Sequence, residues 1–251
     1  MKNEDQWQPS KFVVRNGSLV ASRDPRHVSA ASRLMATLVA RCYDAHLRVQ
    51  ARGRLLDLGC GTVPLYSVYK ESVATVTCVD WGNTLHDRAH LDYEVDLTQP
   101  LPFENGAFDT IVLSDVLEHI PTPEALWKEM ARILSANGKI LVNVPFLYWV
   151  HEAPHDYYRY TEFALRRFVE VSGLRLLAIE PLGGVLEVLT DIFAKCVLQL
   201  PFVGRPLAVA SQSLTLWFSR TRPGRRVTEA TRDRFPLGYF LVAESSVEPE
   251  K

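Results

Sequence analysis

The sequence has few cysteines, almost no net charge and no long apolar run. Its cysteines, Cys42, Cys60, Cys78 and Cys196, lie far apart without a C-x-x-C pair. This spacing indicates neither a zinc knuckle nor a disulfide scaffold, and favours a reducing compartment. No stretch of about 20 uncharged apolar residues occurs, so we expect no membrane span. The polar first residues lack the apolar centre of a signal peptide, and we expect a cytoplasmic protein.

Short apolar runs instead alternate with helical patterns along the chain. Several runs are apolar throughout, as strands covered on both faces are. This alternation predicts an α/β fold with a parallel, doubly wound sheet. Strands are predicted at 54–58, 75–80, 93–95, 108–114, 139–145, 174–180 and 238–243, and helices at 63–71, 123–135 and 161–172.

Two boundaries follow from the first 50 residues. Residues 1–23 are polar and mixed, which predicts a loose N-terminal arm, and residues 24–251 are expected to form one domain. Asp24 and Pro25 predict the N-cap and first residue of a helix that runs to about residue 50.

An insertion at about 185–234 separates the last two predicted strands. Its first helix carries polar residues at every fourth position, namely Glu187, Asp191, Lys195 and Gln199. A narrow polar stripe on an otherwise apolar helix implies that the helix must bury most of its circumference.

The rest of the insertion is a second apolar helix followed by arginines, Arg220, Arg222, Arg225, Arg226, Arg232 and Arg234. Two interpretations remain open. The insertion could contact a lipid-like acceptor or an anionic membrane surface, or it could form a homodimer interface or a small core of its own.

The end of the first strand of the sheet carries two glycines, Gly59 and Gly61. Glycine at this turn lets the main chain approach a ligand that a Cβ would repel. A nicotinamide-cofactor fingerprint would require a third glycine where Pro64 stands, so a dinucleotide is disfavoured. Asp80 ends the second strand, where a carboxylate can accept both hydroxyls of a ribose.

Taken together, several segments resemble one known family. The segments LDLGCG, VD, LPF and VLEH, with Asp96 after the third strand, resemble the core of class I S-adenosylmethionine-dependent methyltransferases. The resemblance runs from Leu55 to about Pro145. It implies S-adenosylmethionine as the cofactor. It also implies a Rossmann-like, seven-stranded sheet of order 3-2-1-4-5-7-6, whose last strand is antiparallel.

The resemblance also implies cofactor-binding roles. The methionine half would lie against Asp57, Gly59, Gly61 and the backbone of Ser114, and Asp57 would organise its ammonium group. The ribose and adenine would contact Asp80, Trp81, Asp96 and the N–H of Leu97. Two departures from the family pattern are Val63, where many members have glycine, and Trp81–Gly82, where a small polar residue is usual.

Candidate catalytic and substrate-binding residues gather in two places. His119 follows Glu118 after the fourth strand, and His151 and His155 lie in the polar and aromatic loop 146–161 after the fifth. Histidine as a residue type suits general-base catalysis near neutral pH, so these three are candidate bases. The loop also supplies candidate substrate contacts, Tyr148, Asp156, Tyr158 and Arg159. In the alternative interpretation, Asp156 and Arg159 pair to hold the loop while tyrosines cover the core.

The sequence thus predicts methyl transfer, at oxygen, to a small-molecule, saccharide or lipid-linked acceptor. One alternative is an N- or C-methyltransferase acting on another small molecule or on RNA. Another is a non-catalytic cofactor-binding protein that uses the insertion for protein contacts. The net charge of −1 does not suggest a nucleic-acid partner, and no metal site is predicted.

Overall fold

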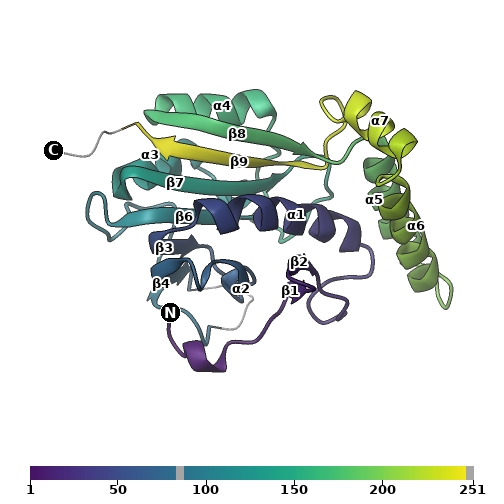
Figure 1. Ribbon diagram of the computed structural model, residues 1–251, viewed down its shortest axis with the longest axis horizontal. Coiled ribbons are helices and arrows are strands. Elements are labelled where there is room, and N and C mark those ends of the chain that lie inside the picture. The colour runs from purple at the N-terminus through teal and green to yellow at the C-terminus, as the bar shows by residue number, and fades with distance from the viewer. Residues whose placement is uncertain (83–87, 247–251) are drawn as a thin grey trace.

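A seven-stranded sheet forms the centre of the protein (Figure 1). The computed structural model describes residues 1–82 and 88–246. The strand order is β5-β4-β3-β6-β7-β9-β8, and β9 runs antiparallel to both its neighbours. This confirms the expected order and the antiparallel last strand. The strands are β3 (Gly53–Leu58), β4 (Val73–Asp80), β5 (Tyr93–Glu94), β6 (Phe108–Ser114), β7 (Leu134–Pro145), β8 (Leu174–Leu182) and β9 (Gly238–Ser245).

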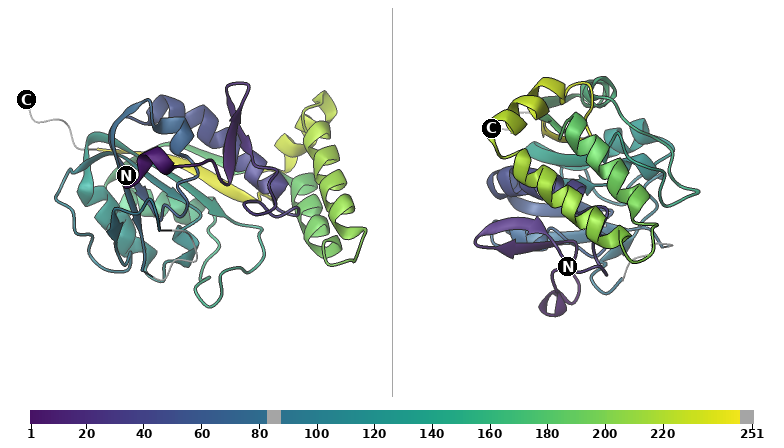
Figure 2. Two further views of the ribbon diagram at one scale, coloured as in Figure 1. Left: turned by 90° about the horizontal axis from the view of Figure 1, so that it is seen from below. Right: turned by 90° about the vertical axis from the view of Figure 1, so that its right-hand side faces the viewer.

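Helices cover both faces of this sheet (Figures 1 and 2). On one face lie α1 (Arg33–Gln50) and α2 (Tyr66–Tyr69), and on the other lie α3 (Pro123–Ile133) and α4 (Glu162–Val171). Each pair packs on its own buried cluster, because successive side chains of a strand point to opposite faces. The central strands β3, β6, β7 and β9 are therefore mostly buried on both sides, which explains their apolar runs.

The N-terminal segment is folded, so the expectation of a loose arm is wrong. It contains a short 3-10 helix, η1 (Glu4–Gln6), and an antiparallel hairpin of β1 (Phe12–Arg15) and β2 (Ser18–Ala21). Phe12 and Leu19 of the hairpin are buried in the core beneath α1. Burial of these two apolar side chains holds the hairpin against the core.

The first long helix begins later than the sequence predicts. Asp24 holds a single turn through the N–H and guanidinium of Arg26, and the helix starts only at Arg33. The free N–H of Leu34 donates to the Gln212 side chain at 2.8 Å, so a distant helix caps α1. Helix α2 is also shorter than predicted, because Val63 has a φ of +51° and the chain turns there.

The insertion consists of three helices, α5 (Val185–Val197), α6 (Gly204–Phe218) and α7 (Arg222–Thr231). The polar stripe of α5 faces inward, with Glu187, Asp191 and Lys195 buried. The expectation that α5 buries most of its circumference is wrong, because apolar residues such as Leu189 and Ile192 are exposed. Among the described residues, no helix is long and apolar enough to cross a membrane.

Candidate active site

The turn after β3 is built around glycine. Gly59 and Gly61 have φ of +75° and +51°, and the N–H groups of Gly59 and Cys60 both donate to Val79 of the neighbouring strand. A Cβ on Gly59 would lie 2.4 Å from the Val116 side chain. Glycine is therefore required here by both backbone conformation and packing, and the turn leaves main chain where a ligand would lie.

Asp80, at the tip of β4, is tied to this turn. Its Oδ2 accepts the N–H of Gly61 at 3.0 Å, and its Oδ1 accepts the N–H of Trp81 at 2.8 Å. The half-exposed Trp81 ring lies edge-on to the imidazole of His155, with centroids 5.1 Å apart. The predicted ribose and adenine contacts thus adjoin the glycine turn and reach the loop 146–161.

Asp57 lies beneath the same turn and is almost fully buried. Its Oδ2 accepts the hydroxyl of Tyr69 at 2.9 Å. Burial and the negative charge of Asp80 raise the pKa of Asp57 to about 7, although the Tyr69 hydrogen bond opposes the shift. A cation placed beside this carboxyl group would stabilise its ionised form.

The remaining predicted cofactor residues lie at the ends of the neighbouring strands. After β5, Asp96 is exposed and its Oδ1 accepts both the N–H and the hydroxyl of Thr98, while the Leu97 side chain enters the core. Ser114 ends β6 and pairs with Asn143 of β7. The carboxyl ends of these parallel strands share one edge of the sheet, as a doubly wound fold requires of a ligand site.

A charged cluster that sequence reasoning missed follows β6 directly. Asp115 has a φ of +55°, and its carboxylate accepts the Lys11 ammonium at 2.7 Å and the Asn143 amide at 2.5 Å. Burial lowers the pKa of Lys11, but the Asp115 carboxylate outweighs it and the net pKa is raised. Asp115 could have been identified from the sequence, because it is a polar residue directly after a parallel strand. Lys11 is distant in the sequence, and no local pattern indicates that it contacts Asp115.

The next turn, the 3-10 helix η2 (Leu117–His119), carries a buried polar group. Glu118 is fully buried, and within residues 1–82 and 88–246 neither of its carboxyl oxygens has a hydrogen-bond partner. Burial, with the negative charge of Asp115, raises the pKa of Glu118 well above its usual value. Burial therefore favours the protonated, neutral form of this side chain.

Two of the predicted histidines adjoin Glu118. The rings of His119 and His151 lie edge to face with centroids 4.9 Å apart, and the Nε2 atoms of both lie 3.8 Å from a Glu118 oxygen. His119 Nδ1 lies 2.9 Å from the His155 carbonyl, which makes Nδ1 the donor and leaves Nε2 unprotonated in the neutral ring. Burial and the neighbouring His119 lower the pKa of His151.

The same three side chains have the composition of a cation site. One ligand atom from each of Glu118, His119 and His151 lies within 4.8 Å of the others. Carboxylate oxygen and imidazole nitrogen are donors that a divalent transition metal prefers. The sequence spacing did not indicate this grouping, because His151 comes from a different loop.

The loop 146–161 is held by its own side chains and by η2. Asp156 pairs with the guanidinium of Arg159 and accepts the N–H of His151 at 2.8 Å. The carbonyl of Glu118 accepts the N–H groups of Tyr157 and Tyr158. Arg159 lowers the pKa of Asp156 to about 2. These contacts support the alternative interpretation in which the Asp156–Arg159 pair holds the loop.

A pocket of about 240 Å³ opens beside this cluster. Its polar wall contains Lys11, Asp115, Glu118 and His151, and its apolar wall comes from α1 and the segment before it. Tyr148 also lines it, with its hydroxyl 3.3 Å from that of Ser32. The exposed His155 is absent from this lining, and the Tyr158 hydroxyl instead donates to the Pro121 carbonyl.

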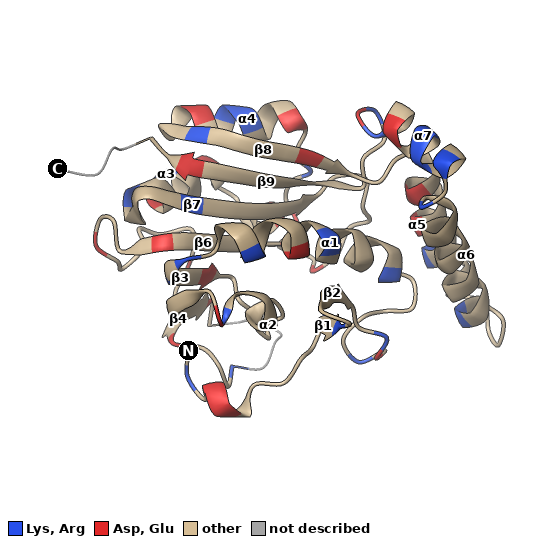
Figure 3. Ribbon diagram, in the orientation of Figure 1, with Lys and Arg blue, Asp and Glu red and all other residues tan. Residues whose placement is uncertain are grey.

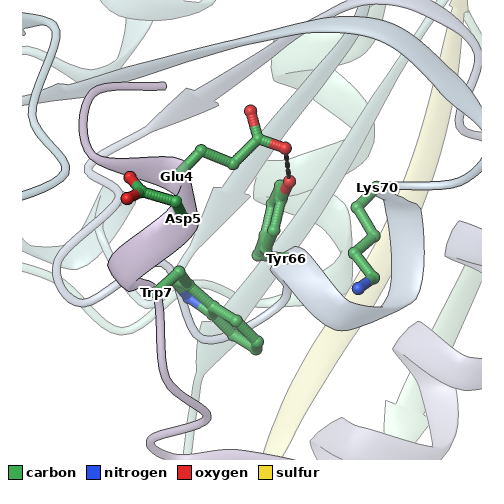
Figure 4. Close-up of a pocket in the computed structure, with 5 residues that line it drawn as sticks. All are labelled: Glu4, Asp5, Trp7, Tyr66 and Lys70. Atoms are coloured by element: carbon green, nitrogen blue, oxygen red, sulfur yellow. Dashed lines mark hydrogen bonds between the residues drawn. The ribbon is translucent and has the colours of Figure 1, made fainter.

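A second, more open hollow of about 600 Å³ lies between η1 and α2 (Figure 4). It is lined by Glu4, Asp5, Trp7, Tyr66 and Lys70, with the Tyr66 hydroxyl donating to Glu4. The Trp7 indole donates to the Val63 carbonyl and so ties η1 to the glycine turn. None of the predicted site residues lines this hollow.

The residues at the sheet edge fit S-adenosylmethionine. The glycine turn leaves room for main-chain contact, Asp80 places a carboxylate at the tip of β4, and Asp57 offers a buried acid to an ammonium group. Together with the antiparallel last strand, these features define an S-adenosylmethionine-dependent methyltransferase. The sequence model of the methyltransferase-domain family matches residues 27–178, and the chain belongs to this family.

Known proteins agree with this class. The chain is 31% identical over 103 residues to a ubiquinone biosynthesis O-methyltransferase of Xanthomonas euvesicatoria, a match that covers 37% of this chain and 43% of the relative. The protein of the same name from Coxiella burnetii is 28% identical over 151 residues, covering 50% and 64%. The chain thus spans less than two thirds of the length of these curated relatives.

Solved structures share the fold. An S-adenosylmethionine-dependent methyltransferase from Mesorhizobium loti superposes with a TM-score of 0.51 at 17% identity, covering 82% of this chain and 99% of that one. A geranyl diphosphate C-methyltransferase from Streptomyces coelicolor, solved with S-adenosyl-L-homocysteine, gives a TM-score of 0.53 at 13% identity, covering 88% and 86%. At these identities the likeness concerns the fold alone.

Proposed function

We propose that this methyltransferase transfers a methyl group to a hydroxyl oxygen of an acceptor held in the pocket beside η2. The observation that carries the proposal is the position of His151. Its ring lines the pocket, next to the buried Glu118 and the ring of His119. The partial similarity to proteins named O-methyltransferases supports oxygen as the acceptor atom.

Methyl transfer to a hydroxyl requires two things of the protein, alignment of the acceptor with the methyl group and a base. S-adenosylmethionine supplies an activated methyl group on a sulfonium with a good leaving group. The pocket walls must hold the acceptor oxygen in line with that methyl, which contributes roughly 7–11 kcal/mol when the geometry is right. A hydroxyl acceptor must also lose its proton, and a positioned base contributes about 100- to 10,000-fold.

His151 is the best placed of the three predicted bases. Its lowered pKa keeps the ring neutral at physiological pH, so a lone pair is available. Its Nδ1 lies 3.4 Å from Asp156, which orients the ring and stabilises its protonated form. His119 Nε2 is enclosed by the cluster, and His155 packs against Trp81, so both support the site without facing the acceptor.

The pocket also limits the size and the polarity of the acceptor. Its volume of about 240 Å³ suits a small ring or the reactive end of a longer molecule. Charged groups on one wall and aliphatic groups on the other suit a hydroxylated acceptor with an apolar portion, such as a small molecule, a saccharide unit or a lipid-linked head. Among the predicted substrate contacts, we retain Tyr148. Asp156, Tyr158 and Arg159 act by holding the loop.

The test is transfer of isotope-labelled methyl from S-adenosylmethionine to a fractionated metabolite extract, followed by identification of the labelled atom. His151→Gln should lower transfer by about 100-fold or more with unchanged affinity for S-adenosylhomocysteine. The matched comparison is His155→Gln, which should lower transfer much less than His151→Gln because His155 does not line the pocket. Label on nitrogen or carbon, or full activity of His151→Gln, would contradict the proposal.

A further inference from the structure

Helix α5 has its polarity reversed relative to an ordinary surface helix. Its charged residues, Glu187, Asp191 and Lys195, are buried, while Leu189 is 59% exposed and Ile192 and Phe193 are also exposed. A soluble helix normally turns its apolar stripe to the core and its charges to water. The outward face of α5 therefore matches an apolar environment better than water.

The buried charges of α5 have internal partners, and only Asp191 Oδ1 lacks a hydrogen bond among the described residues of this helix. Glu187 accepts the N–H of Gly184 and the hydroxyl of Thr228 at 3.0 Å each, and Asp191 pairs with Lys195. The Lys195 ammonium also lies 3.6 Å from the ring centroid of Tyr148. The reversal is thus fixed by contacts within the insertion and by one contact with Tyr148 of the pocket, and α5 cannot rotate its apolar face inward without losing them.

The apolar surface continues around the turn and along α6. Phe202, in the turn, is 99% exposed and Trp217, near the end of α6, is 62% exposed, and Leu200, Val203 and Leu214 are also exposed. Contiguous apolar surfaces of this kind mark interaction sites in soluble proteins. Figure 2 shows α5 and α6 side by side at one end of the molecule, clear of the sheet.

The charges around this surface are predominantly positive. Across residues 185–234, all of which are described, six arginines are exposed against two exposed acids, Glu229 and Asp233. Arg205 lies near the turn, and Arg222, Arg225 and Arg226 lie on α7 (Figure 3). Between residues 185 and 219 every acidic side chain is buried. An apolar face flanked by arginines and free of exposed acids complements an anionic lipid surface.

We propose that the α5–α6 hairpin, together with α7, docks the enzyme on the surface of an anionic bilayer. The apolar side chains enter the boundary between headgroups and acyl chains, and the arginines contact anionic headgroups. The helices lie on the bilayer, because none can cross it. Trp149, which is exposed and lies under the Lys195 ammonium, continues the surface toward the acceptor pocket.

Vesicle flotation tests the proposal and needs neither acceptor nor turnover, so its outcome is separate from that of the proposed function. The full chain is mixed with phosphatidylcholine vesicles with or without phosphatidylglycerol. The wild type should float with the anionic vesicles, and less so as salt is raised. Phe202→Asp/Trp217→Asp should lose binding about tenfold or more. Arg222→Glu/Arg225→Glu should do the same on anionic vesicles.

Phe163→Asp is the matched control, because Phe163 is 79% exposed on α4, away from the hairpin (Figure 1). It should bind vesicles like the wild type. Unchanged affinity for S-adenosylhomocysteine shows that each variant is folded. The proposal is overturned if the wild type stays with the unbound fraction, or if the hairpin variants float as well as the control. A dimer that dissociates in Phe202→Asp/Trp217→Asp would then assign the surface to a second copy of the chain.

Discussion

Replacing Asp57 by Asn should stabilise the free protein above neutral pH while weakening cofactor binding. Asp57 is buried, and its pKa rises from 3.8 in an unfolded chain to about 7 in the fold. The folded state therefore holds a proton over a pH range in which the unfolded state has lost it. This contribution to stability is complete below the unfolded pKa and is lost as the pH rises to about 7.

The size of the effect follows from the shift. About three pKa units at about 1.4 kcal/mol each amount to roughly 4 kcal/mol of pH-dependent stability. Asn cannot ionise but can still accept the Tyr69 hydroxyl, so Asp57→Asn should lose this dependence. At about pH 8 the free energy of unfolding of the variant, measured by urea denaturation, should therefore exceed that of the wild type by up to roughly 4 kcal/mol.

Cofactor binding should move in the opposite direction. If the ammonium of S-adenosylmethionine lies against Asp57, binding favours the ionised carboxylate and expels its proton below about pH 7. Calorimetry in buffers of different ionisation enthalpy measures that proton release. Asp57→Asn should release fewer protons and bind more weakly. Parallel stability profiles for the two proteins, or equal proton release, would refute this reasoning.

Three further variants test separate parts of the structure. Gly59→Ala should lower the free energy of unfolding by about 2–5 kcal/mol, because the left-handed φ and the 2.4 Å contact of the new Cβ with Val116 both destabilise the fold. In urea unfolding, Gly59→Ala/Val116→Ala should recover part of that stability. Lys195→Met should lower the free energy of unfolding by about 3–5 kcal/mol, because it leaves Asp191 buried and unpaired. Lys195→Met/Asp191→Leu should leave that free energy nearly unchanged in the same measurement. Asp80→Ala should lower calorimetric affinity for both S-adenosylmethionine and S-adenosylhomocysteine, and equal affinity would exclude it from the ribose site.

The sheet could be predicted well because its signal is local. Strands buried on both faces carry continuous apolar runs, so segments such as 111–113 and 140–142 can be recognised from the sequence alone. Their order came from the family resemblance, which rests on LDLGCG and the segments after it. Element ends were less predictable. The N-terminus of α1 depends on a hydrogen bond from Leu34 to Gln212, and no local pattern indicates a partner so distant in the sequence.

The site was predictable in part for the same reason. The glycine turn and Asp80 follow strands directly, so their shared edge could be inferred. Lys11 could not, because it reaches Asp115 only through the folding of an N-terminal segment that was predicted to be a loose arm. The inward orientation of the polar stripe of α5 could not be predicted from the sequence either. Its period of four was visible, but whether the stripe faces inward depends on partners elsewhere, such as Thr228 and Tyr148.

A crystal structure with bound S-adenosylhomocysteine tests the central claim most directly. The account predicts that the ribose hydroxyls contact Asp80 and that the sulfur faces the pocket lined by Glu118 and His151. An adenosine bound away from the tips of β3 and β4, or a sulfur turned away from that pocket, would contradict it.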